Sequence, residues 1–363
     1  MSSYGSFSVS TTKPMKILYS VLVLLIPLLS RAEDPLTDMV ERRKTIIKSY
    51  DVSASDVLTV DNQFGQVSVG LWDKAEIRVE IAVTAGASTD AKAQSFLDAV
   101  EIEDKRAGNQ ISVRTNFGQN SLSNWNFNSW RKNGDRNYVK INYTVMMPRR
   151  NALSVRNKFG NTNIPTFHAP LTVHSRYGTF TADDLTNNDT DLNIAYGKAA
   201  IRVVDQAKME VAYADLELSK ANILTLVNKF GKMRIGDVGK LNADIDYSGA
   251  QIGTLRESGK IRLSFSGGFR IDQLPKTADN VNIESAYSSV ALPMANSGDY
   301  DFNVTVSYGN FNYTSSPTLH FSSQPDDSNS RGPKLTKQYV GKVGAGTGTK
   351  VRVVSKFGNV SFK

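Results

Sequence analysis

Few side chains in this sequence could carry chemistry, and they lie far apart. His168 and His174 are six residues apart, but no carboxylate or third histidine stands beside them at the spacing of a metal site. The sequence contains no cysteine, so it offers neither a thiol nucleophile nor a thiolate ligand. We therefore expect histidines in turns or on the surface, with no metal and no cofactor.

Two acidic pairs and one glycine run could also suggest a site. Asp183-Asp184 and Asp326-Asp327 could bind calcium or flank a glycosidic bond, but both lie in polar stretches where Asp is common in turns. The run from Gly344 to Gly348 is superficially like a phosphate loop, yet a strand pattern follows it where a helix would be needed. There is no Gly-x-Ser-x-Gly elbow. We predict no catalytic residues and expect the chain not to be an enzyme.

Exposed aromatic side chains offer another chemistry, which is contact with a ligand. A polar stretch from Asn116 to Asn137 is rich in Asn and Ser but contains Trp125, Phe127 and Trp130. Large rings in such a loop could stack on sugars or insert into a partner. They could also fold back onto a neighbouring sheet. The loop is therefore a candidate contact site with a structural alternative.

The dominant feature of the sequence is a repeated aromatic residue that is usually followed by glycine. It occurs nine times from Phe159 to Tyr308 at spacings of 17 to 22 residues, and again at Phe64 and Phe357. A period of this size indicates an array of structural repeats. Clear copies are Phe159-Gly160, Tyr177-Gly178, Tyr196-Gly197 and Phe230-Gly231.

Each repeat has the pattern of two short strands joined by a bend. Before Phe230, apolar residues alternate with period two, at Leu224 and Leu226. After it they lie three and five positions on, at Met233 and Ile235, so the buried face changes by an odd step. We expect the chain to kink at the glycine, because glycine tolerates positive φ and close backbone approach.

A repeat this short cannot bury its own apolar face, so the repeats must stack into one core. The predicted fold is all-β, a short-coil β-solenoid of either hand, with a β-sandwich of hairpins as the rival. The aromatic residues continue the inward-facing series, so we expect a core stack; the alternative is an outward ladder that stacks on sugars. We expect buried amide hydrogen bonds from the residues two positions before the rings, namely Asn62, Asn157 and Asn228.

The first 32 residues have the pattern of a secretory signal peptide. Lys13 and Lys16 precede an apolar run, and Ser30-Arg31-Ala32 places small residues at the cleavage positions. Met15 is an alternative start to Met1. The run is too short for a transmembrane helix, which needs about 20 residues. Removal of the peptide lowers the formal net charge from +8 to +5, and the remaining charge is spread along the chain, as on a solvated surface.

Four regions are expected along the chain. Residues 1–32 are the signal peptide, and 33–150 form an N-terminal β-rich segment with one helix at Thr89–Val100. Residues 151–318 are the solenoid repeats. Residues 319–363 contain a linker and C-terminal capping strands, the last of them in the pair Val351–Phe362.

The sequence resembles the exported bacterial β-strand-repeat proteins called putative adhesins, a domain family of unknown function. The resemblance rests on Leu58–Val69 (LTVDNQFGQVSV), on the strand and helix that follow it, and on the repeated Asn-Lys-Phe-Gly motif. It extends from about Lys44 to the C-terminus. It implies a β-helix-like fold, a location in the cell envelope and no catalytic residues.

Together these features lead us to expect a non-catalytic protein of the cell envelope that presents a binding face, as an adhesin or a scaffold rod. It would be exported to the periplasm, the outer-membrane surface or the medium. Its partner would be an envelope protein or a surface glycan, and not nucleic acid. Two alternatives stay open: a carbohydrate-binding or carbohydrate-active β-helix protein, and a periplasmic module in envelope signalling.

Overall fold

A computed structural model describes residues 39–117, 137–294, 298–325 and 335–363, and every structural statement below refers to these residues. They form an all-β structure with one helix, and most of the strand pairs are parallel. The rival sandwich of hairpins is therefore wrong, because successive repeats pair side by side in the same direction.

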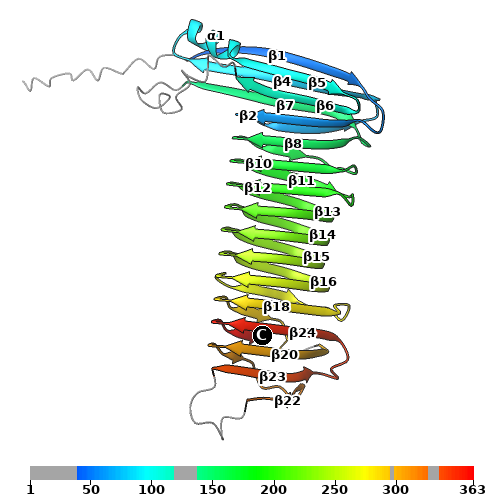
Figure 1. Ribbon diagram of the computed structural model, residues 1–363, viewed down its shortest axis with the longest axis vertical. Coiled ribbons are helices and arrows are strands. Elements are labelled where there is room, and N and C mark those ends of the chain that lie inside the picture. The colour runs from blue at the N-terminus through cyan, green and yellow to red at the C-terminus, as the bar shows by residue number, and fades with distance from the viewer. Residues whose placement is uncertain (1–38, 118–136, 295–297, 326–334) are drawn as a thin grey trace, which may run out of the picture. The chain divides into compact units, whose positions relative to one another are not determined.

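The central part is a solenoid-like stack of parallel coils, which we call the coil stack (Figure 1). Its longest strands each run from one kink to the next. Along β13 and β14 the register partners are 17 residues apart, from Lys198 with Asp215 to Ala212 with Lys229, so one coil has 17 residues. These strands are β13 (Lys198–Ala212), β14 (Asp215–Lys229), β15 (Lys232–Asp246) and β16 (Gly249–Ser264).

Shorter strands continue the coil stack on both sides of this region. On the N-terminal side they are β8 (Ala152–Lys158), β9 (Thr162–Ile164), β10 (Leu171–Arg176), β11 (Thr179–Leu185) and β12 (Thr190–Ala195). On the C-terminal side they are β17 (Phe269–Gln273), β18 (Asn280–Ala286), β19 (Val290–Leu292), β20 (Tyr300–Ser307) and β21 (Phe311–Asn312).

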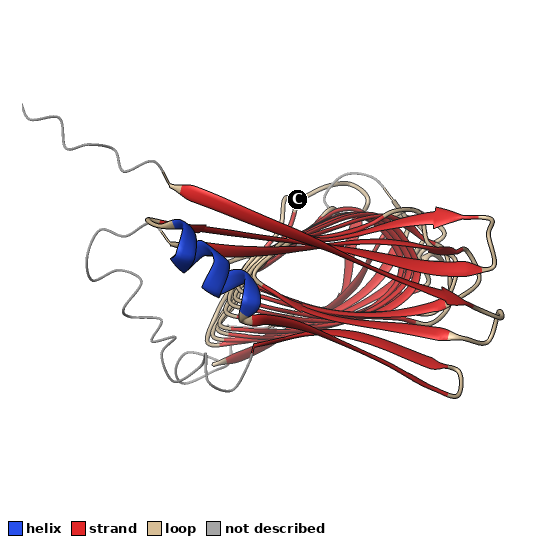
Figure 2. Cartoon of the chain, turned by 90° about the horizontal axis from the view of Figure 1, so that it is seen from above, coloured by secondary structure: helices blue, strands red, loops and turns tan. Residues whose placement is uncertain are grey.

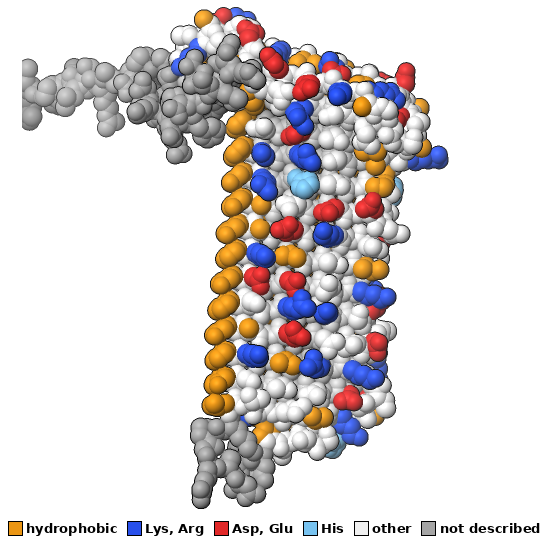
Figure 3. All heavy atoms as spheres, viewed as in Figure 1, with side chains coloured by type: hydrophobic (Ala, Val, Ile, Leu, Met, Phe, Trp, Pro, Cys, Tyr) orange, Lys and Arg blue, Asp and Glu red, His pale blue; other side chains and the backbone are white. Residues whose placement is uncertain are grey.

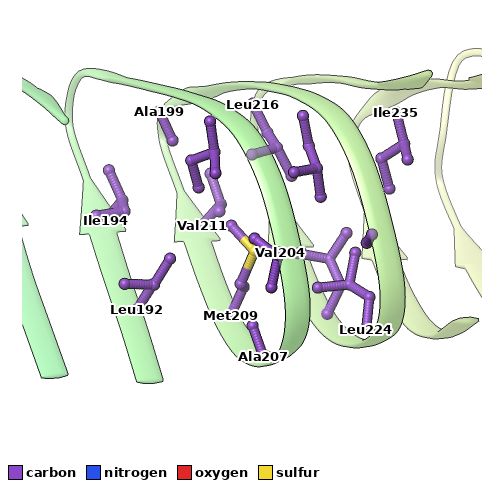
Figure 4. Close-up of a cluster of buried hydrophobic side chains, with 14 of the residues drawn as sticks. Leu192, Ile194, Ala199, Val204, Ala207, Met209, Val211, Leu216, Leu224 and Ile235 are labelled. Carbon is purple, nitrogen blue, oxygen red and sulfur yellow. The ribbon is translucent and has the colours of Figure 1, made fainter. Parts of the chain in front are cut away.

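One hydrophobic core runs through the interior of the coils. Side chains of successive coils, among them Leu192, Val211 and Leu224, point into it (Figure 4). The change of phase that the sequence predicts is confirmed, since Met233 and Ile235 are both buried. Seen from above, the strands of successive coils lie over one another (Figure 2). Each coil therefore completes the core of its neighbours, as short repeats require.

Antiparallel strands close the N-terminal end of the coil stack. The strand β4 (Glu76–Ala87) pairs antiparallel with both β1 (Val40–Asp51) and β7 (Tyr138–Pro148), and β5 (Val100–Ala107) pairs antiparallel with β6 (Gln110–Phe117). The strand β7 runs parallel to β3 (Val67–Trp72), and β6 runs parallel to β2 (Val57–Gln63). Together β2 and β3 form the first complete coil. This end therefore covers a hydrogen-bonding edge of the sheet, which would otherwise pair with another chain.

The predicted helix is present as α1 (Asp90–Asp98) and packs on β1 and β4. The Thr89 side chain accepts a hydrogen bond from the backbone N–H of Lys92, which is the usual role of an N-cap threonine. Ala93 and Leu97 form its buried face. The apolar positions were thus sufficient to locate this element.

The last strand pair lies inside the coil stack, which corrects the prediction of a terminal cap. Here β24 (Thr349–Lys356) pairs in parallel with β18 on one side and β20 on the other. Likewise β25 (Val360–Phe362) lies between β19 and β21. The C-terminal end is closed by β23 (Thr336–Val343), antiparallel to β20, and by β22 (Leu319–Ser323) paired with β23. The chain order and the stacking order differ here.

Candidate functional site

The repeated aromatic residue has the same unusual backbone conformation in every coil. All eleven have φ between 50° and 62°, and they account for every non-glycine residue with positive φ in the described part of the chain. A left-handed residue reverses the direction in which the side chain leaves the backbone, so each ring points to solvent. The residues are Phe64, Phe159, Tyr177, Tyr196, Tyr213, Phe230, Tyr247, Phe265, Tyr287, Phe357 and Tyr308, in their order along the stack.

The prediction that these rings form a core stack is therefore wrong. Ten of the eleven expose 42 to 56% of their surface. The alternation of buried and exposed positions ends at the ring itself. The residue two positions before the ring, such as Asn157, is fully buried, and continued alternation would have buried the ring as well. The kink was also assigned to the wrong residue, since the positive φ belongs to the aromatic residue and not to the following glycine.

The rings form one continuous stack along the edge of the coils, which we call the aromatic ladder (Figure 3). Successive ring centroids are 4.7 to 5.2 Å apart and the ring planes differ by 4 to 8°. Phe357 fits between Tyr287 and Tyr308, so the C-terminal coil supplies a rung to the ladder. Each interior ring has its two faces covered by its neighbours.

This geometry decides what the aromatic ladder can contact. Because the faces are covered, a sugar cannot stack flat on an interior ring. The exposed parts are the ring edges, which carry the positive side of the aromatic quadrupole, and the hydroxyl groups of the tyrosines. The outward ladder that the sequence left as an alternative is therefore present, but face-on sugar stacking is excluded along its interior.

In several coils, glycine follows the ring because the preceding coil approaches closely. A Cβ atom at Gly178 would lie 2.0 Å from the carbonyl oxygen of Gly160, far inside contact distance. The predicted close backbone approach is thus confirmed. Four coils carry a small residue with a Cβ at the equivalent position, namely Ala214, Ser248, Ser266 and Ser288.

Buried amides hold the backbone behind three rungs of the aromatic ladder, as predicted from Asn62, Asn157 and Asn228. All three side chains are fully buried. The Nδ2 of Asn62 donates to the carbonyl of Ile141 at 3.0 Å and to Oδ1 of Asn157 at 3.2 Å. The Nδ2 of Asn228 donates to Oγ of Ser248 at 2.9 Å. These bonds satisfy corner groups that water cannot reach.

Ring stacking and backbone strain are of similar size at these positions. A left-handed conformation costs an L-residue roughly 1–2 kcal/mol. An interior ring forms two stacked pairs, and each pair contributes about 0.5–1.5 kcal/mol beyond the burial of the ring surface. Gly or Asn would adopt the same backbone with less strain but without a ring, and the exposed ring edges are the part of the aromatic ladder that a partner can reach.

This balance predicts different effects for two substitutions of Tyr213. We expect Tyr213→Asn to change the free energy of unfolding by no more than about 2 kcal/mol, because two stacked pairs are lost while Asn tolerates positive φ. We expect Tyr213→Val to lower it by about 1–3 kcal/mol more, because a β-branched residue is strained there. Urea denaturation followed by circular dichroism measures both. Equal losses for the two variants would contradict our account of the kink.

His168 and Asp184 do not join the aromatic ladder. His168 Nδ1 is hydrogen-bonded to Oγ1 of Thr186, and Asp184 is ion-paired with Arg202 at 2.5 Å. Within the described ranges, no three His, Cys, Asp or Glu side chains come close enough to hold a metal. Trp125, Phe127, Trp130 and the pair Asp326-Asp327 lie outside the described residues.

The glycine run near the C-terminus binds a side chain of the chain itself. The backbone N–H groups of Gly346 and Thr347 donate to Oδ1 of Asp299, and these hydrogen bonds, with one from the Thr347 hydroxyl, lower the pKa of that carboxyl. Farther away, burial raises the pKa of Tyr143 to about 12, and its hydroxyl is hydrogen-bonded to Thr115. Both groups have local structural partners.

Sequence reasoning missed one ring that contacts the aromatic ladder. The ring of Phe117 meets the ring of Phe64 edge-on at a centroid distance of 5.7 Å, at the N-terminal end of the aromatic ladder. The signal was present, because Phe117 is also followed by a glycine. It was hidden because Phe117 lies within the polar stretch from Asn116 to Asn137, away from the regular array.

These observations define a solenoid-like all-β protein with an exposed aromatic ladder. No protein-family model and no curated protein matches the sequence. No helix in the described ranges has the length and apolar character needed to cross a membrane.

Solved structures similar to the chain include three that are described as an adhesin or a cell adhesion protein. A putative cell adhesion protein from Clostridium sporogenes is 10% identical, with 89% of this chain and 99% of that chain covered and a TM-score of 0.20. A putative adhesin from Bacteroides fragilis is 9% identical, with coverage of 88% and 97% and a TM-score of 0.32. A putative adhesin from Parabacteroides distasonis is 13% identical, with coverage of 88% and 97% and a TM-score of 0.27. At these TM-scores the similarity carries no argument about function.

Proposed function

We propose that this chain is a non-catalytic, exported protein of the cell envelope that binds a surface molecule through its aromatic ladder, as an adhesin or scaffold. One observation carries the proposal: large aromatic side chains are held half-exposed in a continuous row, each in a left-handed backbone conformation that Gly or Asn adopts with less strain. The signal-peptide pattern of residues 1–32 supports export.

The regular spacing of the ladder favours an extended partner. Each coil presents the same kind of ring edge about every 5 Å, in a straight row beside exposed polar side chains. A polymer with a short repeat, such as a surface glycan or an extended protein segment, meets equivalent groups at every coil. A compact ligand would use only one or two of them. The proposed role is therefore contact along a line.

Removing rings while keeping the kink tests this proposal. We expect the triple variant Tyr177→Asn/Tyr196→Asn/Tyr213→Asn, made in the chain without residues 1–32, to keep its circular dichroism spectrum and to lose saturable binding to envelope fractions of the producing organism. Cosedimentation measures the binding. Asn retains the left-handed backbone, so the change is confined to the exposed edges.

A matched control removes exposed apolar side chains elsewhere. Ile47 and Ile223 are 51% and 42% exposed and lie outside the aromatic ladder. We expect Ile47→Asn/Ile223→Asn to bind as the unchanged protein does. Unaltered binding by the folded triple variant, or no saturable binding by the unchanged protein, would contradict the proposed function.

A further inference from the structure

Four basic residues lie in a two-by-two grid beside the upper rungs of the aromatic ladder. Arg156 and Lys158 lie on β8, and His174 and Arg176 lie opposite them on β10, in register as Arg156 with His174 and Lys158 with Arg176. Their side chains are on the outer face, next to the rings of Phe159 and Tyr177. Figure 3 shows basic side chains and a histidine beside the upper part of the ladder. We call these four residues the basic patch.

The arrangement of the basic patch is unfavourable for the protein alone. Neighbouring parallel strands are about 4.8 Å apart, and like charges directly opposite each other destabilise a sheet. Among the described residues, no ion pair involves Arg156, Lys158 or Arg176. Asp61 is the register partner of Arg156 on β2, but its carboxylate is paired with Arg114 at 3.5 Å. A positive excess therefore persists at this place.

Two of the three cations in the corresponding positions of later coils, Lys229 and Arg262 but not Lys356, have an anionic partner among the described residues. Lys229, which precedes its ring as Lys158 does, lies 3.9 Å from Asp246. Arg262, three positions before its ring as Arg156 is, lies between Asp244 at 3.6 Å and Glu284 at 3.8 Å. Lys229 and Arg262 thus have acidic neighbours on this face, whereas the basic patch has no anionic partner among the described residues.

Beyond the basic patch the surface side chains beside the aromatic ladder become small, and the rings carry hydroxyl groups. The positions of Lys158 and Arg176 are taken in the next two coils by Ala195 and Ala212. Beside these alanines stand Tyr196 and Tyr213, whose rings continue the stack from Tyr177. A polymer lying along the aromatic ladder would therefore meet cations first, and then small side chains beside the tyrosine hydroxyl groups.

We propose that the basic patch, together with Tyr177, Tyr196 and Tyr213, binds an acidic polysaccharide whose chain runs along the coil stack. The inference deepens the proposed function and rests on the aromatic ladder being a contact surface. Carboxylates on the sugars would pair with Arg156, Lys158 and Arg176, in charge-assisted hydrogen bonds. Sugar hydroxyls would bond the tyrosine hydroxyls, and ring edges would add to the favourable potential for anions.

The width of the positive area favours a polymer over an anionic membrane. Asp61 borders the basic patch on one side, and Asp191 and Glu210 lie beyond it on the other, with Glu210 accepting a hydrogen bond from Asn193 at 3.0 Å. A flat anionic surface would press against these carboxylates as well as the cations. A chain one sugar wide can follow the ladder edge and avoid them.

Calorimetric titration with polygalacturonate oligosaccharides tests the inference, with the fully methyl-esterified oligosaccharides as the uncharged probe. We expect the acidic probe to bind, the ester to bind at least tenfold more weakly, and the affinity to fall as ionic strength rises to about 0.1 M, where the screening length is about 10 Å. We expect Lys158→Gln/Arg176→Gln to weaken acidic-probe binding by about tenfold or more, since charge-assisted contacts are lost.

The control pair Lys229→Gln/Arg262→Gln removes the same charge from the same face and should leave the affinity within about twofold. Equal weakening by both pairs, or equal binding of the ester, would overturn the inference. So would stronger binding of polyglutamate or of phosphatidylglycerol vesicles that depends on Lys158 and Arg176, which would assign the basic patch to an acidic protein or a membrane.

The two proposals can fail separately. If the triple tyrosine variant loses envelope binding while the acidic probe does not bind, the polysaccharide site is wrong and the contact role of the ladder stands. If the probe binds through the basic patch but the triple variant binds both probe and envelope normally, the ladder is not the contact surface, and the proposed function and the part of the site assigned to tyrosines both fail.

Discussion

Replacing Gly231 by Val should lower the free energy of unfolding by about 3 kcal/mol or more, because overpacking here forces the backbone to move. A Cβ atom at this position would lie 2.0 Å from the carbonyl oxygen and 2.8 Å from the carbonyl carbon of Ala214 in the preceding coil. Neither atom belongs to a flexible side chain. Relief requires β14 and β15 to separate at the corner, which weakens their parallel hydrogen bonds and the ring contact of Phe230 with its neighbours. Urea denaturation measures the loss.

Gly249→Val is the matched control. Gly249 begins β16 beside the next corner, is exposed, and would have no heavy atom within 4 Å of an added Cβ. Valine is favoured in strands and restricts the unfolded chain, so we expect unchanged or slightly higher stability. If the two valine variants lose similar free energy, close approach of the coils is not the reason for glycine at position 231.

Replacing Asn157 by Leu should lower the free energy of unfolding by about 2–4 kcal/mol, the range for loss of several buried hydrogen bonds. Its side chain is fully buried. Its Nδ2 lies within hydrogen-bond distance of the carbonyls of Gly65 at 3.1 Å and Asn161 at 3.0 Å, while its Oδ1 accepts from Asn62. Leucine has a similar volume and provides none of these bonds, so the buried amide of Asn62 loses one acceptor.

Two other asparagines calibrate this prediction. Asn228 is equally buried but bonds only Ser248, and its Oδ1 has no partner in the described structure, so we expect Asn228→Leu to cost less than Asn157→Leu. Asn193 is half-buried on the outer face and bonds Glu210, so we expect Asn193→Leu to stay within about 0.5 kcal/mol of the unchanged protein. Thermal or urea unfolding ranks the three. The reverse order of Asn157 and Asn228 would contradict the role given to the amide network.

Much of the fold follows from local features of the sequence. Alternation before each ring and the odd step after it correctly identify the buried residues, such as Leu224, Met233 and Ile235. Buried asparagines are predicted from the same alternation, and the helix after Thr89 from its apolar positions. These predictions succeed because each depends on the periodicity of a few neighbouring residues, which packing against the next coil then satisfies.

The direction of the rings could not be obtained in this way. Alternation predicts the face of a residue only while the backbone stays extended, and one left-handed residue reverses it. Glycine seemed the residue to carry that conformation, because it bears no strain there. The structure places positive φ on the aromatic residue and uses Gly178 or Gly231 to let the coils approach. Local propensity is overridden by contacts with the next coil, and so the aromatic ladder is exposed.

The sequence by itself determined the repeating strand–kink–strand unit, its buried side chains and the need for units to stack. Only the tertiary structure decided which coils are neighbours, placing β24 between β18 and β20 so that Phe357 completes the ladder. The physical reason is that every coil presents the same kind of hydrogen-bonding edge, so local patterns do not rank one neighbour above another. The same stacking decides whether a charge such as Arg156 or Arg262 meets a like or an opposite charge, which is why the basic patch emerged from the fold.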